Sequence, residues 1–305
     1  TSVLLRETVD SVVTNPKGIY VDCTLGGAGH AHAVGEMLDP EGMIIGLDQD
    51  EDALSVARQR LSDLKCQVLT IPTNFSNLKE ALRNAGIYEV DGFIFDLGVS
   101  SYQLDTPERG FSYMNDGPLD MRMDKERGFS AYEVVNGYSF DELVRIFRDY
   151  GELKNASGIA NKIINARNLG KITSAKELAN IIGTAQIKGR GVSPAILAFQ
   201  AIRIEVNGEL DELTNLLDSI EKGGFRDCLV AIITFHSLED RIVKERFKKW
   251  ANSCICPPGV YRCECGNNHE LGEILTKKPL TASQSELAQN SRSKSAKLRV
   301  FKIKG

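Results

Sequence analysis

The sequence Ile19-Tyr20-Val21-Asp22-Cys23-Thr24-Leu25-Gly26-Gly27-Ala28-Gly29 decides the fold of this protein. An apolar run ends at Asp22, and a glycine-rich turn then leads into residues with helical spacing, which is the pattern of a β-strand followed by a helix. Glycines in such a turn let the backbone approach a ligand closely, so a small anionic or polar ligand fits here. A tight turn that binds nothing is the alternative.

Short apolar runs and amphipathic stretches alternate around this turn, as in a parallel sheet covered by helices. We expect strands at 19–22, 43–48, 67–71 and 92–96 and helices near 30–38, 51–64 and 77–85. From about 107 to 200 the apolar spacing is helical, which predicts a helical insertion. The α/β pattern then resumes with a helix over 202–220, a strand at 228–235, a helix at 238–250 and a final strand at 298–303.

The composition is that of an ordinary globular chain, and 305 residues suffice for two domains or for one domain with a large insertion. Hydrophobic residues make up 42% and charged residues 26%, which excludes disordered, collagen-like and coiled-coil proteins. A net charge of −4 excludes a uniformly basic nucleic-acid coat, and no apolar stretch approaches the length of a membrane span. Seven irregularly spaced cysteines fit a reducing compartment. We expect a cytoplasmic protein, or an organellar one if a leader once preceded Thr1.

Two carboxylates stand at the carboxyl ends of predicted strands, where open α/β sheets bind their ligands. Asp48 follows Gly26 by about 20 positions, the place of a ribose-binding carboxylate; the alternative is a helix cap. Asp96 ends the strand at 92–96 and could hold an amino group or accept a hydrogen bond from an amine that is about to be methylated; the alternative is a cap of the next turn. This pattern alone does not separate a nicotinamide enzyme from an S-adenosylmethionine enzyme.

Longer motifs make the sequence more specific. They are VLLRE at 3–7, DCTLGGAGH at 22–30, DLGVSSYQL at 96–104, ERGFSYMNDGPLDMRMD at 108–124, FQAIRIEVNGEL at 199–210 and FHSLEDR at 235–241. Together they resemble the RsmH (MraW) family of ribosomal RNA cytosine-N4 methyltransferases over nearly the whole chain. The resemblance implies an α/β fold, a class I (Rossmann-like) methyltransferase sheet over 1–106 and 201–305, with an inserted all-helical domain for substrate recognition at 107–200.

The resemblance also implies the reaction. The protein would transfer a methyl group from S-adenosyl-L-methionine to the exocyclic N4 of a cytidine in small-subunit ribosomal RNA near the decoding centre. Its partner would be the small ribosomal subunit RNA or an assembly intermediate. Two alternatives stay open: a non-catalytic assembly factor that binds the cofactor, and a nicotinamide oxidoreductase, for which the sequence supplies no proton relay.

Matching the family motifs gives three sets of site residues. In the cofactor set, Asp48 would take the ribose hydroxyls and Phe75 would border the adenine. The full cofactor set is Gly26, Ala28, Gly29, His30, Asp48, Phe75, Asp96 and Gln103. The catalytic set is Asp96, Ser100 and His236, although His236 could equally flank a helix that Ser237 caps. The RNA-binding set is Arg203, Arg241, Arg292 and Lys294.

Basic residues cluster at 241–249 and 292–304, with five and six respectively, and such runs could face phosphates; the alternative is a solvated helix face and a frayed tail. The sequence departs from the family pattern at Ser193-Pro194-Ala195-Ile196-Leu197, where the family usually has His-Pro-Ala-Thr-Arg. The missing arginine removes one basic group near the expected RNA face. A further departure is Ala31, where the family usually has serine.

No metal is expected, because methyl transfer does not require one. His30 and His32 are interpreted as wall residues, since no third ligand lies near them in the sequence. Cys254-x-Cys256 and Cys263-x-Cys265, followed by His269, form a compact cluster. The spacing differs from the Cys-x-x-Cys of zinc ribbons, which favours reduced thiols in an ordered loop; structural zinc is the alternative.

Overall fold

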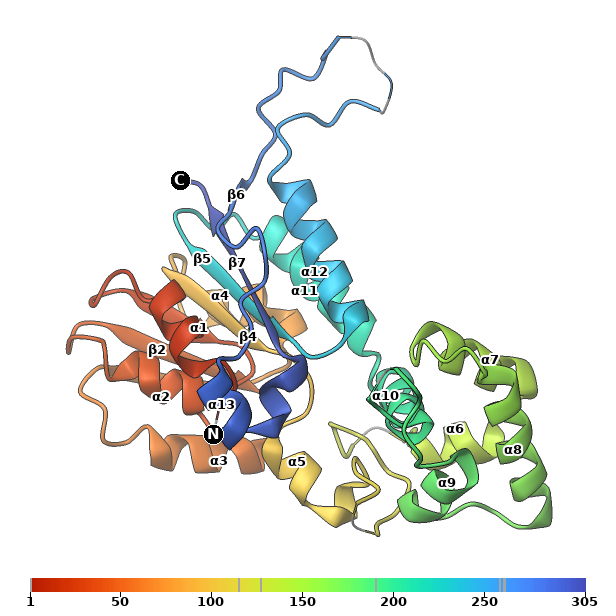
Figure 1. The fold of residues 1–305 in the computed structure, drawn as a ribbon. Coiled ribbons are helices and arrows are strands. Elements are labelled where there is room, and N and C mark those ends of the chain that lie inside the picture. The colour runs from red at the N-terminus through yellow and green to blue at the C-terminus, as the bar shows by residue number, and fades with distance from the viewer. Residues whose placement is uncertain (1, 115, 127, 190, 258, 260–261) are drawn as a thin grey trace. The chain divides into compact units, whose positions relative to one another are not determined.

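The computed structural model describes residues 2–114, 116–126, 128–189, 191–257, 259 and 262–305 (Figure 1). The chain forms two compact units, a sheet unit (Thr1–Gly98 with Asp211–Gly305) and a helical unit (Val99–Leu210). Both boundaries lie outside the 107–200 span expected for the insertion, so residues 99–106 and 201–210 belong to the helical unit. Within the described residues, no helix combines the length and the apolar character needed to cross a bilayer.

The sheet unit is built on seven strands in the order β3-β2-β1-β4-β5-β7-β6. The strands are β1 (Ile19–Asp22), β2 (Met43–Asp48), β3 (Gln67–Pro72), β4 (Gly92–Asp96), β5 (Leu229–Thr234), β6 (Gly272–Ile274) and β7 (Lys297–Ile303). β1 to β5 run parallel, whereas β7 is antiparallel to both of its neighbours. The expected strands and the α/β fold are confirmed; neither β6 nor the direction of β7 was predicted.

Helices cover both faces of this sheet. They are α1 (Leu5–Val12), α2 (Gly29–Gly35) and α3 (Glu51–Arg60) on one face, and α4 (Leu78–Asn84), α11 (Glu209–Glu221) and α12 (Ser237–Trp250) on the other. Successive strand residues alternate between the two cores: Ile94 packs with the first group, and Phe93 and Phe95 pack with the second. Burial on both faces explains why the central strands β1, β2, β4 and β5 are nearly continuous apolar runs, whereas β3 at the sheet edge is partly exposed.

The prediction of a single helix over 202–220 is wrong, because two helices cover this range. α10 (Pro194–Asn207) ends at Gly208, which has φ 64°, and α11 begins at the next residue. A left-handed residue terminates an α-helix, and glycine adopts that conformation without steric cost. The apolar spacing continues on both sides of the break, so periodicity could not reveal it.

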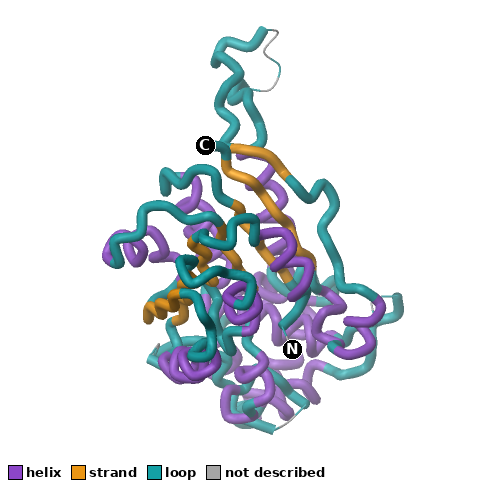
Figure 2. Tube along the Cα trace, turned by 90° about the vertical axis from the view of Figure 1, so that its left-hand side faces the viewer, coloured by secondary structure: helices purple, strands orange, loops and turns teal. Residues whose placement is uncertain are grey.

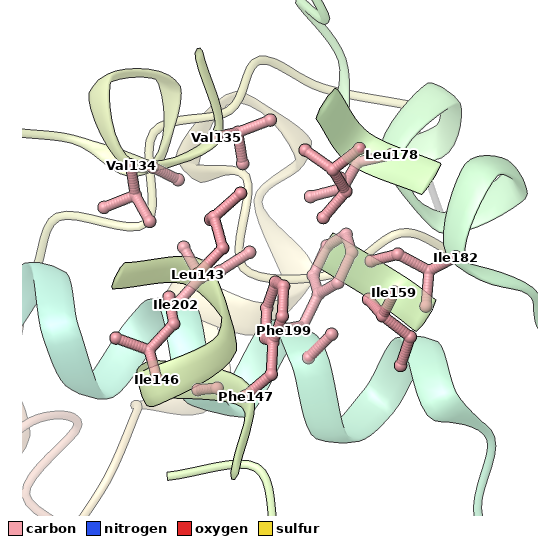
Figure 3. Packing of buried hydrophobic residues seen from close by; sticks show 14 of the residues in the cluster. Val134, Val135, Leu143, Ile146, Phe147, Ile159, Leu178, Ile182, Phe199 and Ile202 are labelled. Atoms are coloured by element: carbon pink, nitrogen blue, oxygen red, sulfur yellow. The ribbon is translucent and has the colours of Figure 1, made fainter. Parts of the chain in front are cut away.

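The helical unit packs its helices around one apolar core (Figure 3). Its helices are α5 (Ser101–Asp105), η2 (Pro107–Arg109), α6 (Ala131–Gly137), α7 (Phe140–Asp149), α8 (Ala156–Leu169), α9 (Ala175–Ile182) and α10. Phe147 from α7 and Phe199 from α10 lie at the centre of this cluster in Figure 3. Serine side chains cap four of the helices; among them, the Ser193 hydroxyl accepts the Ile196 N–H at 3.3 Å. The departure at Ser193 therefore supplies a helix cap.

The motif at 108–124 forms a clamp inside the helical unit. The buried Arg109 guanidinium donates through Nη2 to the carbonyls of Arg122 and Met123, at 2.8 and 3.1 Å. Asn207 accepts from the Met123 N–H through Oδ1 and donates through Nδ2 to the Met121 carbonyl, both at 2.8 Å. Met121 is buried with φ 58°, an unfavourable conformation that these bonds stabilise. The motif therefore organises the fold of this unit.

Replacing Asn207 with alanine should destabilise the helical unit by about 1–3 kcal/mol for each backbone group left buried without a partner. Urea unfolding measures the loss, and hydrogen exchange at the Met123 amide reports it locally. Asn180→Ala, at an exposed position, is the matched control. Equal exchange at Met123 in the two variants would show that Asn207 does not hold this loop.

Candidate functional site

The candidate site lies where the strand order of the sheet reverses. β1 pairs with β2 on one side and with β4 on the other, and ligands of open α/β sheets bind beyond the carboxyl ends of the strands at such a point. Asp22 ends β1 and Asp96 ends β4. The register, in which Asp22 is opposite Ile94, places both carboxylates at this edge.

The glycine-rich turn between β1 and α2 adopts an unusual backbone conformation. Gly26 and Ala28 have φ of 45° and 55°, both left-handed. This conformation costs a residue with a Cβ about 1 kcal/mol, so Ala28 is strained, and such strain is typical of ligand-binding turns. A Cβ at Gly29 would collide with the Ser2 hydroxyl, whereas Gly27 is exposed and has open space around it. The turn thus leaves backbone accessible at Gly27.

Asp48 ties the end of β2 to this turn. Its Oδ2 accepts the Gly26 N–H at 2.8 Å, and its Oδ1 accepts the Asp50 N–H at 2.9 Å. Burial raises the pKa of this carboxyl, and the two N–H donors oppose the shift. Each carboxylate oxygen retains a second lone pair for further donors. Asp48 can therefore accept hydrogen bonds from two hydroxyls while it holds the turn in place.

Asp96 lies at this edge of the sheet near two other acidic side chains, those of Asp22 and Glu239. Its backbone N–H donates to Thr24 Oγ1 at 2.6 Å, which fixes the end of β4 against the turn. Its Oδ1 is buried and has no hydrogen-bond partner among the described residues. Burial raises the pKa of Asp96 to about 8, and the neighbouring carboxylates of Asp22 and Glu239 add to the shift. A buried acceptor surrounded by acids favours a cationic or strongly hydrogen-bond-donating ligand.

Asp22 contributes the second buried carboxyl. Its Oδ1 accepts the Thr24 N–H at 3.1 Å, and its side chain is almost completely inaccessible. Burial raises its pKa to about 7 despite hydrogen bonds from Thr24 and Ala31. No role of Asp22 was predicted, because the sequence does not show that its carboxyl lies near enough to Asp96 to raise the pKa of Asp96.

His30 lies in the wall beside Asp96. Its Nε2 is 2.9 Å from the Val3 carbonyl, which can only accept, so Nε2 carries the proton. Its Nδ1 is 3.7 Å from Asp96 Oδ2. Burial lowers the pKa of His30 to about 4, so the ring is neutral and does not compensate the acids. His32 contacts the exposed Asp63 instead, at 3.3 Å.

His236 is itself the N-cap of α12, which corrects the alternative that placed Ser237 there. Its Nδ1 accepts the Glu239 N–H at 3.4 Å, and the Glu239 carboxylate accepts the N–H groups of His236 and Phe235. Nε2 lies 3.2 Å from Glu239 Oε1 without hydrogen-bond alignment, and is buried. Because Nδ1 accepts, neutral His236 carries its proton on Nε2. The spacing of His236 and Glu239 is that of a capping box, a pattern that could have identified Glu239 from the sequence.

The other predicted cofactor residues come from two places. Phe75 begins the short helix η1 (Phe75–Asn77) after β3 and is partly buried against the sheet core. Ser100 and Gln103 belong to the helical unit and bond to each other: the Ser100 N–H donates to Gln103 Oε1 at 3.0 Å, and the Gln103 N–H to Ser100 Oγ at 3.2 Å. These bonds hold the start of α5, and cofactor contact by Gln103 stays a prediction.

The predicted RNA-binding residues differ in exposure. Arg203 forms a bidentate ion pair with Glu209, at 2.8 and 2.9 Å, and its side chain is only 17% exposed. Arg241 and Lys294 are exposed, and Arg292 is half-buried.

Many basic side chains of the two runs are also paired with acids. Arg246 and Lys249 contact Glu221, and Lys297 and Arg299 contact Asp240. Much of the positive charge of both runs therefore serves internal ion pairs.

Comparison with known proteins identifies the family. The chain is 73% identical over 305 residues to the Ribosomal RNA small subunit methyltransferase H of Campylobacter concisus, covering 100% of this chain and 98% of that protein. It is 54% identical to the protein of that name from Campylobacter curvus, with 100% and 98% coverage. It is 49% identical to that from Clostridioides difficile, with 98% and 97% coverage. The model of the MraW methylase family matches residues 1–304, and the chain therefore belongs to this family.

Proposed function

We propose that this protein transfers a methyl group from S-adenosylmethionine to the exocyclic N4 of a cytidine in small-subunit ribosomal RNA near the decoding centre. Family membership makes the chain a methylase, and the relatives are named for small-subunit ribosomal RNA. The observation that carries the proposal is the buried, unpartnered Oδ1 of Asp96 beside Asp22 and Glu239. This acidic edge suits a cationic methyl donor and an amine acceptor.

S-adenosylmethionine is the methyl donor of this family, and it supplies a methyl group activated by a positively charged sulfur. The edge of the sheet at the carboxyl ends of the parallel strands fits S-adenosylmethionine in two respects. Asp48 has lone pairs available for ribose hydroxyls, and Phe75 offers an apolar surface for the adenine. Asp96 would receive the methionine amino group or the reacting amine, beside the turn that contains Gly26, Ala28 and Gly29.

The amine of cytosine is a weak nucleophile because its lone pair is delocalised into the ring. The protein must hold N4 in line with the methyl group and accept its N–H bonds, so that the lone pair becomes available as attack proceeds. Ionised Asp96, with the backbone carbonyls of 97–100, would be the acceptor. The amine proton can leave after transfer, so no strong base is required.

His236 has a positioning role in this proposal. Its buried Nε2–H is directed by the cap on Nδ1, and it could donate to the carbonyl of a bound pyrimidine. A base in this site must be unstacked from its neighbours, which is the usual requirement for chemistry on a nucleobase.

The experiment that tests the function uses small ribosomal subunits from cells that lack the protein, incubated with it and labelled S-adenosylmethionine. Nucleoside mass spectrometry should find the label in N4-methylcytidine at one site. Label in another nucleoside would contradict the proposed target. Cofactor binding without transfer to any assembly form of the subunit would favour the non-catalytic assembly factor.

Asp48→Ala should weaken S-adenosylmethionine binding about tenfold or more, because charge-assisted hydrogen bonds contribute roughly 1.5–3 kcal/mol each. Titration calorimetry measures the dissociation constant. Asp39→Ala removes an exposed carboxylate elsewhere in the same unit and should leave binding unchanged. Unchanged affinity in Asp48→Ala would remove Asp48 from the cofactor site.

Asp96→Asn separates two roles of the carboxylate. The amide keeps the size but offers one neutral acceptor oxygen in place of two charged ones. If Asp96 accepts from the attacking amine, the single-turnover rate at saturating cofactor should fall more than the affinity does. If Asp96 instead binds the methionine amino group, the dissociation constant of S-adenosylmethionine should rise and the single-turnover rate at saturating cofactor should stay unchanged. A variant with an unchanged dissociation constant and an unchanged single-turnover rate would contradict both roles of Asp96.

Cofactor binding should release a proton at neutral pH. In the free protein the raised pKa of Asp96, about 8, leaves it largely protonated at pH 7, and a bound cation favours the ionised form. Affinity should therefore rise with pH between 6 and 7, by about tenfold per unit at most. Calorimetry in buffers of different ionisation enthalpy measures the number of protons released for each cofactor bound. Asp96→Asn should reduce the release to the part that comes from Asp22, whose pKa is also raised, to about 7. An undiminished release in that variant would show that Asp96 does not supply the proton.

A further inference from the structure

The four cysteines of the loop between α12 and β6 converge in the folded chain. The sulfurs of Cys254, Cys256, Cys263 and Cys265 all lie within 4.8 Å of one another. Cys254 and Cys263 are separated by 3.7 Å, Cys263 and Cys265 by 3.5 Å, and Cys265 and Cys254 by 3.7 Å. All four are free thiols. A tetrahedral zinc ion with Zn–S bonds of about 2.3 Å requires sulfurs about 3.8 Å apart, which matches these separations.

The backbone around the sulfurs has a reciprocal arrangement. The N–H of Ile255, which follows the first cysteine of one pair, points to Cys265 Sγ at 3.4 Å. The N–H of Glu264, which follows the first cysteine of the other pair, points to Cys256 Sγ at 3.4 Å. Donors directed at sulfur stabilise thiolates and orient them, as outer contacts of metal ligands do. His269 is not a member of the cluster, because its Nε2 is 2.7 Å from the Cys265 carbonyl.

The described part of this loop has no apolar core that would gather these thiols. None of the described residues between 252 and 269 is buried. Figures 1 and 2 show this segment extending beyond α12 and the end of the sheet. A loop of this length whose described residues form no helix or strand is uncommon, and such loops are usually functional or linkers. Four thiols meeting in an exposed loop therefore need an attraction other than hydrophobic burial.

We propose that Cys254, Cys256, Cys263 and Cys265 bind one structural zinc ion that orders the loop between α12 and β6. The geometry of the sulfurs thus favours the alternative that the sequence analysis had left open. Zinc is the ion suited to four thiolates in tetrahedral geometry.

The role of the ion is structural for two reasons. Four protein sulfurs fill its coordination sphere, so no position stays open for substrate. The cluster also follows the carboxyl end of α12, whereas His236 caps the amino end of that helix. Fourteen helical residues separate the two by about 20 Å. Zinc therefore takes no part in methyl transfer, and the proposal does not depend on the proposed function.

The test measures zinc in the full chain purified without chelator or metal resin. Mass spectrometry of the metal should find one zinc per chain, and X-ray absorption should find four sulfurs at about 2.3 Å. The double variant Cys254→Ser, Cys256→Ser should lose the metal, whereas Cys66→Ser, which removes a buried thiol outside the cluster, should keep it. Removal of zinc should expose residues 251–271 to proteolysis and leave S-adenosylmethionine affinity unchanged.

Three results would overturn the proposal. The first is less than about one-tenth equivalent of zinc per chain after growth with added zinc. The second is coordination of the zinc by nitrogen or oxygen atoms in the X-ray absorption spectrum. The third is full zinc content in the double variant. The absorption spectrum is taken on the unaltered protein, so the proposal stays testable if the double variant does not fold.

Discussion

The burial of several carboxyl groups at one edge of the sheet is the constraint on which the site depends. Asp22 and Asp96 stand there because β1 and β4 are neighbours, and α12 adds Glu239. Burial raises the pKa values of Asp22 and Asp96 to about 7 and 8. Because both lie above the ordinary value of 3.8, the free protein loses stability as pH rises from about 4 through 8. A bound cation reverses this loss, so ligand binding and folding stability are coupled through the same two groups.

The long motifs that make the sequence recognisable serve two different purposes. The turn at 22–30 and Asp96 place backbone and carboxylates where a cofactor can bind. By contrast, Arg109 of the motif at 108–124 and Asn207 of the motif at 199–210 bond to backbone groups of their own unit. Such buried polar contacts are expensive to leave unsatisfied, so these residues are fixed by folding. A motif can therefore identify the family through residues that hold the fold together.

Most of the fold was predictable because it rests on local signals. β1, β2, β4, β5 and β7 are mostly buried runs, and β3 is an apolar run at the partly exposed edge of the sheet. Asp48 and Asp96 were found because they end two of the buried runs. β6 has only three residues and is half-buried, so the sequence did not predict it. Gly208 ends α10 within a helical apolar pattern that continues on both sides, so the break between α10 and α11 was not predicted either. The proximity of Glu239 to Asp96, and the lack of a partner for the Asp96 oxygen, depend on which strand and helix ends meet in space. The pairing of Arg203 with Glu209 and the convergence of the cysteines likewise require the folded chain.

The anchoring of α12 explains how the acids are kept together. When Asp96 is ionised, repulsion between Glu239 and Asp96 would move the amino end of this helix away from the edge. Ion pairs from Asp240 to Arg299, which is buried, and from Arg246 to Glu221 oppose that movement. Phe247 and Trp250 are buried against Phe301, with ring centroids 5.2–5.5 Å apart, and each contributes about 1.5–3 kcal/mol. Apolar packing at the carboxyl end of α12 therefore acts together with these ion pairs to hold the buried charge at its amino end.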